Sequence, residues 1–245
     1  MIHVTVWNEY QHEKCEEDIA KIYPEGIHGA IAAFLGKEED MEVRTATLDM
    51  PEHGLTDEVL DWTDVLLWWG HMAHEKVSEE VAMKVRDHIL RGMGFLALHS
   101  AHNSKPFRYT LGTSGALSWS GVDRERVWVC TPSHPIAQGI PTSFELEREE
   151  MYGEPFGIPT PDDNVFISWY RGGEVFRSGC TFRRGAGKIF YFSPGHESFP
   201  TYYNPIIQKI LINAIRWAKP VVKEPPFSCP QIKTAPEASR PDFHL

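Results

Sequence analysis

The sequence predicts an α/β fold with a mostly parallel sheet, helices on both of its faces and a β-hairpin extension. Over the first hundred residues, short apolar runs alternate with segments whose apolar residues recur at helical spacing. This alternation is typical of parallel strands joined by crossover helices. The middle of the chain instead holds several strand-like segments separated by Gly- and Pro-containing turns, which predicts the hairpin extension.

Each element of the first half follows from its own residue pattern. Strands are expected at residues 2–7, 42–48, 64–69 and 94–98. A helix is expected at about residues 26–37, because the apolar residues between positions 27 and 34 share one face. Another helix begins after Ser78, a favourable N-cap residue, and continues to about residue 91 before Gly92 ends it.

The second half combines strands, one helix and a proline-rich tail. Strands are expected at residues 126–130, 165–170, 175–182 and 188–192. The Arg171-Gly172-Gly173 segment predicts a hairpin turn, and residues 204–218 have the pattern of an amphipathic helix. We therefore expect one domain at residues 1–219. Six prolines exclude regular structure from residues 220–245, which form either a flexible terminus or an arm that lies on the same or a neighbouring subunit.

The sequence argues against three classes of protein: membrane-spanning, secreted and nucleic-acid-binding. No apolar run approaches the roughly 18 residues of a membrane span, and the first residues resemble a strand rather than a secretory signal. A net charge of −10 without a dense basic stripe argues against nucleic-acid binding. The four cysteines are widely spread and form no CxxC pair, which favours reduced thiols and a cytoplasmic location.

The tetrapeptide His-x-Ala-His occurs twice, as His71-Met72-Ala73-His74 and as His99-Ser100-Ala101-His102. Each copy follows an apolar run that we expect to be a buried parallel strand. Ligands of open α/β sheets bind just outside the carboxyl ends of the strands. The two copies therefore mark the predicted functional edge of the sheet.

The second copy has the pattern of a nucleophile elbow centred on His99. Small residues stand two positions before and after it, at Ala97 and Ala101, as a tight strand-to-helix turn requires. A histidine there could act as an acid or base, as a metal ligand or as a hydrogen-bond partner of a neighbouring loop. Near the end of a late strand, His196 and Glu197 form a second candidate pair.

An elbow after the fourth strand and a His-Glu pair after a late strand resemble the class I glutamine amidotransferase-like fold, a three-layer flavodoxin-like architecture. The amidotransferase elbow carries a cysteine where this chain has His99, so glutaminase activity is not expected. Within that fold the chain resembles the trehalose-utilisation (ThuA-like) family from about residue 3 to residue 218. The matching stretches are Trp7-Asn8-Glu9, Tyr23-Pro24-Glu25-Gly26-Ile27-His28, Trp68-Trp69-Gly70-His71, Ala97-Leu98-His99-Ser100-Ala101-His102, His134-Pro135-Ile136 and Pro194-Gly195-His196-Glu197. The resemblance implies a role in sugar catabolism and, more loosely, one with keto derivatives of disaccharides.

Histidines gather at the predicted strand exits, and this favours a metal site. Seven of the twelve are expected there: His12, His28, His71, His74, His99, His102 and His196. Neutral imidazole is the commonest zinc ligand, and catalytic zinc takes three protein ligands and a water. We expect a divalent cation, zinc in the first instance, on His71, His102 and His196, with His28 in reserve. Glu9 and Glu197 would fix a histidine tautomer or act as a general base.

Aromatic and polar residues beside the same loops suggest a sugar ligand. Aromatic faces stack on sugar rings, although core packing explains any single aromatic residue equally well. The expected substrate-binding residues are Trp69, His74, Lys105 and Tyr202. The partner is then a small-molecule sugar, and the tail and the aromatic content suggest self-association into a homo-oligomer.

Two functions remain open from the sequence. The first is an enzyme that performs metal-assisted acid–base chemistry on a disaccharide or keto-sugar related to trehalose, with Glu9, His99 and Glu197 as catalytic residues. The second is a non-catalytic sugar-binding or regulatory protein on an amidotransferase-like scaffold. One fold hosts many functions, so the fold does not separate them.

Overall fold

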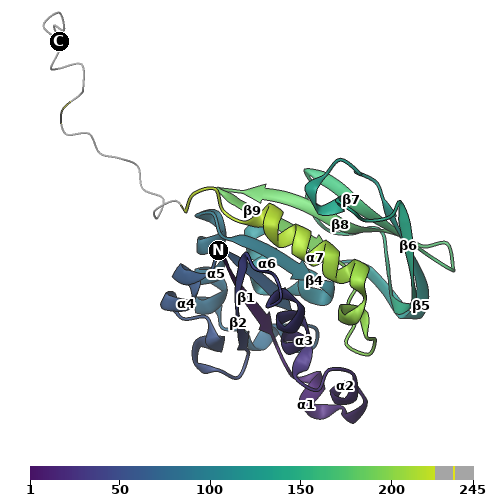
Figure 1. The fold of residues 1–245 in the computed structure, drawn as a ribbon, viewed down its shortest axis with the longest axis horizontal. Helices are drawn as coiled ribbons and strands as arrows, with labels where there is room; N and C mark the ends of the chain where they lie inside the picture. Colours follow the sequence, from purple (N-terminus) through teal and green to yellow (C-terminus); the bar gives the residue numbers. More distant parts are fainter. Residues whose placement is uncertain (224–233, 235–245) are drawn as a thin grey trace, which may run out of the picture.

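A computed structural model describes residues 1–223 and residue 234. Its centre is a nine-stranded sheet with the order β2-β1-β3-β4-β9-β8-β7-β5-β6 (Figure 1). The parallel part consists of β2 (Met41–Thr47), β1 (Ile2–Asn8), β3 (Val65–Trp69), β4 (Gly94–Leu98) and β9 (Gly187–Phe192). The antiparallel part consists of β8 (Val175–Arg184), β7 (Asp163–Tyr170), β5 (Ser118–Val129) and β6 (Ser143–Gly153). The mixed sheet with flanking helices confirms the predicted fold class.

Helices cover both faces of the parallel part. One face carries α3 (Gly26–Leu35) and α7 (Pro205–Ala218), and α7 runs across the front of the sheet in Figure 1. The other face carries α4 (Asp57–Trp62), α5 (Glu79–Leu90) and α6 (Lys105–Leu111). Two short helices, α1 (His12–Cys15) and α2 (Glu17–Ile22), follow β1. Short 3₁₀ turns are η1 (Pro51–Gly54), η2 (His74–Lys76), η3 (His99–Asn103), η4 (Pro135–Ala137) and η5 (Thr201–Tyr203).

The period of two along the central strands divides the core into two clusters. In β4, Leu96 and Leu98 pack with α3 and α7, whereas Phe95 and Ala97 pack with α5 and α6. All five residues of β4 are buried, as expected for a strand that is covered on both faces. This is why β3 and β4 appear in the sequence as continuous apolar runs. Their carboxyl ends, where polar residues return, lie at one edge of the sheet.

The predicted helix starts and turns are confirmed. Ser78 accepts a hydrogen bond from the backbone N–H of Val81 at 3.2 Å, which caps α5. The turn between β7 and β8 contains Gly173 at φ +98°, a conformation that glycine adopts readily. None of the described helices is long and apolar enough to cross a membrane. The tail prediction lies outside the described residues except for residues 220–223 and 234.

The extension is larger than the sequence suggested, because β6 was not expected from the pattern. Its partner β5 begins at Ser118, well before the predicted start at residue 126. The pairing of β5 with β6 shifts register twice, and each irregularity interrupts the alternation of apolar and polar residues. β6 matters for function because its carboxyl half reaches the histidines at the end of β4.

Candidate functional site

His99 stands directly after β4 in a strained turn. Its φ is +52°, an uncommon conformation for a residue with a side chain, and the residue is 1% exposed. The Nδ1 atom lies 2.8 Å from the carbonyl oxygen of Ser193, so Nδ1 carries a proton and donates it to that oxygen. In the tautomer with this proton the lone pair is on Nε2, which lies 3.3 Å from a carboxylate oxygen of Glu150.

His71 reaches the same place from the loop after β3. Glu9 holds this loop, since its two carboxylate oxygens accept the N–H groups of Met72 at 2.8 Å and Ala73 at 3.0 Å. The Nδ1 atom of His71 lies 2.8 Å from Glu197 Oε2. This carboxylate fixes the ring orientation and leaves Nε2 for a ligand, the arrangement of a metal-binding histidine with an outer carboxylate.

His196 comes from the loop after β9, and its ring has the opposite tautomer. The backbone N–H of Ser198 donates to His196 Nδ1 at 3.1 Å, so the proton of the neutral ring is on Nε2. Nε2 lies 3.4 Å from Glu197 Oε1. Glu149 holds the loop by accepting the N–H groups of Gly195 and His196, each at 3.2 Å.

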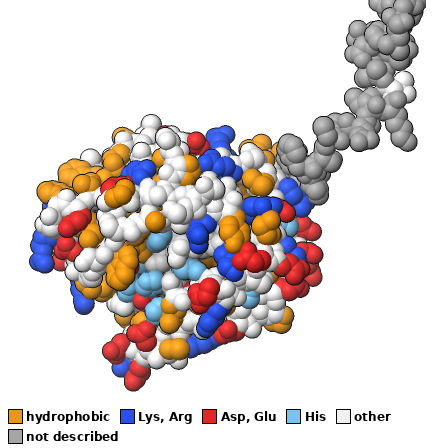
Figure 2. Space-filling model, turned by 180° about the vertical axis from the view of Figure 1, so that it is seen from behind, with side chains coloured by type: hydrophobic (Ala, Val, Ile, Leu, Met, Phe, Trp, Pro, Cys, Tyr) orange, Lys and Arg blue, Asp and Glu red, His pale blue; other side chains and the backbone are white. Residues whose placement is uncertain are grey.

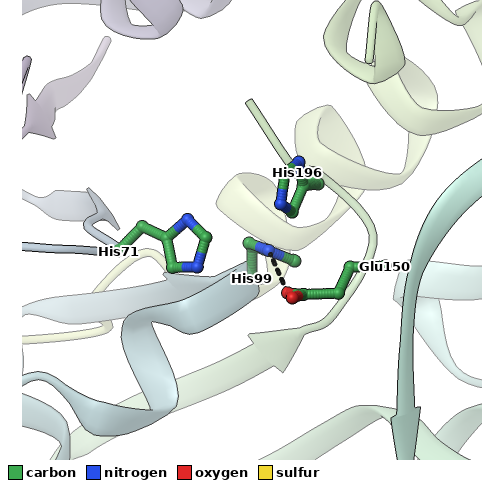
Figure 3. A group of neighbouring side chains, drawn as sticks. All are labelled: His71, His99, Glu150 and His196. Carbon is green, nitrogen blue, oxygen red and sulfur yellow. Dashed lines mark ion pairs between the residues drawn. The ribbon is translucent and has the colours of Figure 1, made fainter. Parts of the chain in front are cut away.

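The four side chains His71, His99, His196 and Glu150 converge on one point (Figure 3). One ligand atom from each lies within 4.8 Å of the others. A second group shares one member: atoms of His12, His71 and Glu197 meet the same limit. Viewed from the side opposite to Figure 1, several histidine side chains lie close together at the surface (Figure 2). The His71 side chain is 25% exposed, so solvent can reach the site.

Burial and charge set the protonation of these groups. Burial and the neighbouring His99 lower the pKa of His196 to about 4, so its ring is neutral at pH 7. Burial opposes ionisation of Glu197, but its hydrogen bond to His71 and the charges of nearby histidines outweigh this effect and lower its pKa to about 2. For His71, burial is likewise outweighed by Glu197, which raises the pKa of the imidazole. The contact with Glu197 therefore favours a proton on the His71 nitrogen that faces the carboxylate.

Tyr152, on β6, lies beside His99 and contributes a buried hydroxyl to the site. Its hydroxyl lies 3.2 Å from His99 Nε2 and 2.6 Å from Ser100 Oγ. Burial raises the pKa of this phenol well above its usual value, so the hydroxyl keeps its proton. Tyr152 can thus donate a hydrogen bond to a lone pair or to a bound oxygen.

The structure brings together four of the predicted site residues, His71, His99, His196 and Glu197, and separates others from them. His102 lies beside the site with its Nδ1 2.7 Å from the carbonyl oxygen of Gly115, but it belongs to neither ligand group. His28 also lies outside both groups, and its Nδ1 is 3.1 Å from Asn8 Nδ2. Both oxygens of Glu9 are occupied by backbone N–H groups.

The four residues expected to bind substrate lie mainly in packing positions. Trp69 is fully buried and donates from Nε1 to the carbonyl oxygen of Gly195 at 2.9 Å. Tyr202 is fully buried against the same loop. Lys105 donates to the carbonyl oxygens of Glu75 and Val77. Burial lowers the pKa of His74 to about 4, so this imidazole is neutral at pH 7.

Sequence reasoning missed Glu149, Glu150 and Tyr152, all on β6, and gave His12 no role. The available signal was the alternation of Phe144 and Leu146 with charged residues, which indicates a strand with one buried face. That pattern does not predict that the end of the strand lies beside the end of β4. The approach of β6 to the elbow is a property of the whole sheet order.

Comparison with known proteins agrees with this architecture. The model of the ThuA family, described as trehalose utilisation, matches residues 3–218. No curated protein matches the chain. A solved ThuA-like protein from Parabacteroides merdae ATCC 43184 is 14% identical with a TM-score of 0.67, over 91% of this chain and 93% of that one.

Two further solved structures share the fold. The cytoplasmic protein STM1381 from Salmonella typhimurium LT2 is 10% identical with a TM-score of 0.57, over 89% of this chain and 100% of that one. A β-galactosidase from Rahnella sp. R3 is 12% identical with a TM-score of 0.55, over 89% of this chain and 32% of that one. At such identities a structural match shows the fold alone. The family match covers most of the chain, and the protein therefore belongs to the ThuA family of trehalose utilisation.

Proposed function

We propose that this protein is an enzyme that binds a divalent cation and performs acid–base chemistry on a disaccharide or keto-sugar related to trehalose. One observation carries the proposal: His71, His99, His196 and Glu150 converge from four different segments. Titratable groups that gather in a partly buried site are typical of catalytic and ligand-binding sites. The choice of a sugar related to trehalose rests on the description of the family, trehalose utilisation.

The donor set fits a borderline cation such as zinc. His71 and His99 each anchor Nδ1 on an acceptor and keep Nε2 for a ligand, and Glu150 adds a carboxylate. Two histidines and one glutamate form a common catalytic zinc set, which leaves a position for water or substrate. Such a cation polarises a carbonyl group or lowers the pKa of a bound water.

The remaining groups bind and orient the substrate. His196 is neutral and has its proton on Nε2, so it donates a hydrogen bond to a substrate oxygen. The protonated hydroxyl of Tyr152, which lies 3.2 Å from His99 Nε2, donates a second hydrogen bond to the substrate. Glu197 fixes His71, and its Oε1 atom lies 3.4 Å from His196 Nε2. Glu9 keeps the His71 loop in place rather than moving a proton, since both of its oxygens are occupied.

The charge of the site favours a neutral substrate. Among the described residues, every ion pair of Glu150 and Glu197 is made with a histidine, and none with lysine or arginine. A site for a phosphate or carboxylate would carry such cations. A neutral sugar offers hydroxyl and carbonyl groups that match the donors and acceptors described here. We also place the protein in the cytoplasm as a homo-oligomer, a proposal that fractionation and light scattering test.

The test is zinc analysis of untagged protein, followed by incubation with trehalose and with its 3-keto derivative. We expect bound zinc and turnover of at least one sugar. His99→Ala should lose both, whereas His88→Ala, the same change on the distant helix α5, should keep both. Protein without zinc after exposure to the metal would contradict the metal site. Sugar-dependent thermal stabilisation without product would instead support the binding protein.

A further inference from the structure

We propose that His12, His71 and Glu197 form a second cation site, so that the protein holds a pair of divalent cations. The proposal goes beyond the first site but shares His71 with it. One ligand atom of each of the three residues lies within 4.8 Å of the others. None of the assigned roles of the first site uses His12.

His12 supplies the observation that points to a ligand. The residue is 9% exposed, and its Nε2 atom is fully buried with no hydrogen-bond partner. Its Nδ1 lies 2.8 Å from Glu16 Oε1, a contact in which Nδ1 donates and Nε2 keeps the lone pair. A buried acceptor without a donor is costly. A cation at this position would satisfy it.

Glu197 presents a second acceptor to the same space. Its Oε1 atom lies 3.8 Å from His12 Nε2, too far for a hydrogen bond and close enough for both atoms to bind one cation. An imidazole lone pair and a carboxylate that face each other repel unless a positive charge lies between them.

His71 connects the two sites. Its Nδ1 faces Glu197 and its Nε2 is free for the group with His99 and Glu150. The ring centroid of His71 lies 5.3 Å from that of His12 and 5.5 Å from that of His99. A second cation would take the place of the proton that Nδ1 shares with Glu197, and that proton would leave to solvent. The resulting imidazolate would bind one cation through each nitrogen.

Local charge favours a second cation. Glu9, Glu13, Glu150 and Glu197 lie on or beside the loops of the site, and three of them are buried. Within the described part of the chain, none of the four forms an ion pair with lysine or arginine. One dication neutralises only two carboxylates. Imidazole and carboxylate ligands together suit zinc or a similar first-row metal better than calcium or magnesium.

The test is calorimetric titration of the metal-stripped full chain with zinc, with metal analysis of the product. We expect two equivalents for the wild-type protein, one for His12→Ala and two for His88→Ala. One equivalent in the wild type would overturn the second site and leave the first intact. No bound zinc would overturn both. Two equivalents in both the wild type and His12→Ala would place the second ion elsewhere and also overturn the proposal.

Crystals of the wild-type protein provide a measurement that does not depend on a folded variant. After a zinc soak, anomalous scattering at the zinc edge should show two peaks, with His71 between them. A single peak beside His99 and Glu150 at saturating zinc would contradict the proposal. Two peaks of which neither contacts His12 would contradict it as well.

Discussion

At the scale of single residues, hydrogen-bonded partners assign different roles to chemically identical imidazoles. His99 donates from Nδ1 to a carbonyl oxygen, whereas His196 accepts at Nδ1 from an N–H group. The first ring can therefore offer Nε2 to a metal, and the second offers a proton. In the sequence the two residues are both histidines, and the residue type does not specify a tautomer. The sequence pattern predicted that both lie at the site. It could not assign their tautomers, because the hydrogen-bond partner of His99 belongs to another segment and that of His196 to a local turn.

The tautomers predict different zinc affinities for two variants. His99→Ala removes a ligand and should weaken zinc binding by more than about 100-fold. His196→Ala removes a hydrogen-bond donor and should change zinc affinity by less than about 10-fold, while it abolishes turnover of the sugar. Competition against a chelating dye measures the two dissociation constants. Equal loss of zinc affinity in both variants would contradict the assignment of His196 as a donor.

His102 makes the stability of the fold sensitive to acid. Burial lowers its pKa to about 3, despite its hydrogen bond to Gly115, against about 6.5 in the unfolded chain. The unfolded state therefore binds the proton more readily, so stability falls as the pH drops from about 6.5 towards 3. Between pH 7 and pH 5 this group should cost the protein about 2 kcal/mol of unfolding free energy.

Urea unfolding of metal-stripped protein at the two pH values tests this effect. His102→Asn cannot bind the proton, so its loss of stability between pH 7 and pH 5 should be about 2 kcal/mol smaller than that of the wild type. His3→Asn, the same substitution at a partly buried histidine of β1 outside the site, is the comparison that shows how much of the change the loss of any imidazole causes. An unchanged pH dependence in His102→Asn would show that other groups cause the acid sensitivity.

At the scale of elements, the strands of the parallel part were predictable and the loops that shape the site were not. β3 and β4 are buried on both faces, so their sequences are nearly continuous apolar runs. β6 has one partly exposed face and several glutamates, and its register with β5 shifts. Glu149 is buried on that strand because it binds backbone N–H groups of the loop after β9. A partner so distant in sequence leaves no local pattern.

The loop that carries His196 depends on Gly195. This glycine has φ +137°, and a Cβ atom there would overlap the hydroxyl of the buried Tyr202. Gly195→Ala should lower the unfolding free energy by about 3 kcal/mol or more, from backbone strain and overpacking together. It should also weaken zinc binding, because the loop and its contacts with Glu197 would shift.

Gly112→Ala is the matched control for that change. Gly112 also has a positive φ, +65°, but no atom lies within 4 Å of the position of an added Cβ. Only the strain of the left-handed conformation remains, about 1 to 2 kcal/mol. Chemical denaturation of the two variants compares the effects. A similar loss of stability in both would mean that the contact with Tyr202 does not constrain the loop.

At the scale of the whole molecule, the proposed metal site joins the two parts of the sheet. His71 and His99 follow strands of the parallel part, and Glu150 lies on the edge strand of the antiparallel part. The sequence predicted the parallel part and its functional edge from local periodicity. It could not predict that the far edge strand folds back to that edge, because such an approach depends on the twist and order of all nine strands.

A cation that takes ligands from both parts should stabilise the whole chain against unfolding. The ligand atoms are assembled only in the folded state, so binding adds RT ln(1 + [Zn]/Kd) to the unfolding free energy. At a free zinc concentration 100 times the Kd of the site, the gain should be about 2.7 kcal/mol. Urea unfolding with zinc and with a chelator measures it. The Glu150→Gln variant should lose most of this gain, although the two histidine ligands of the cation on the parallel part remain. If Glu150→Gln instead kept the full gain, the antiparallel part would contribute nothing to the cation, and the two parts would not be coupled through it.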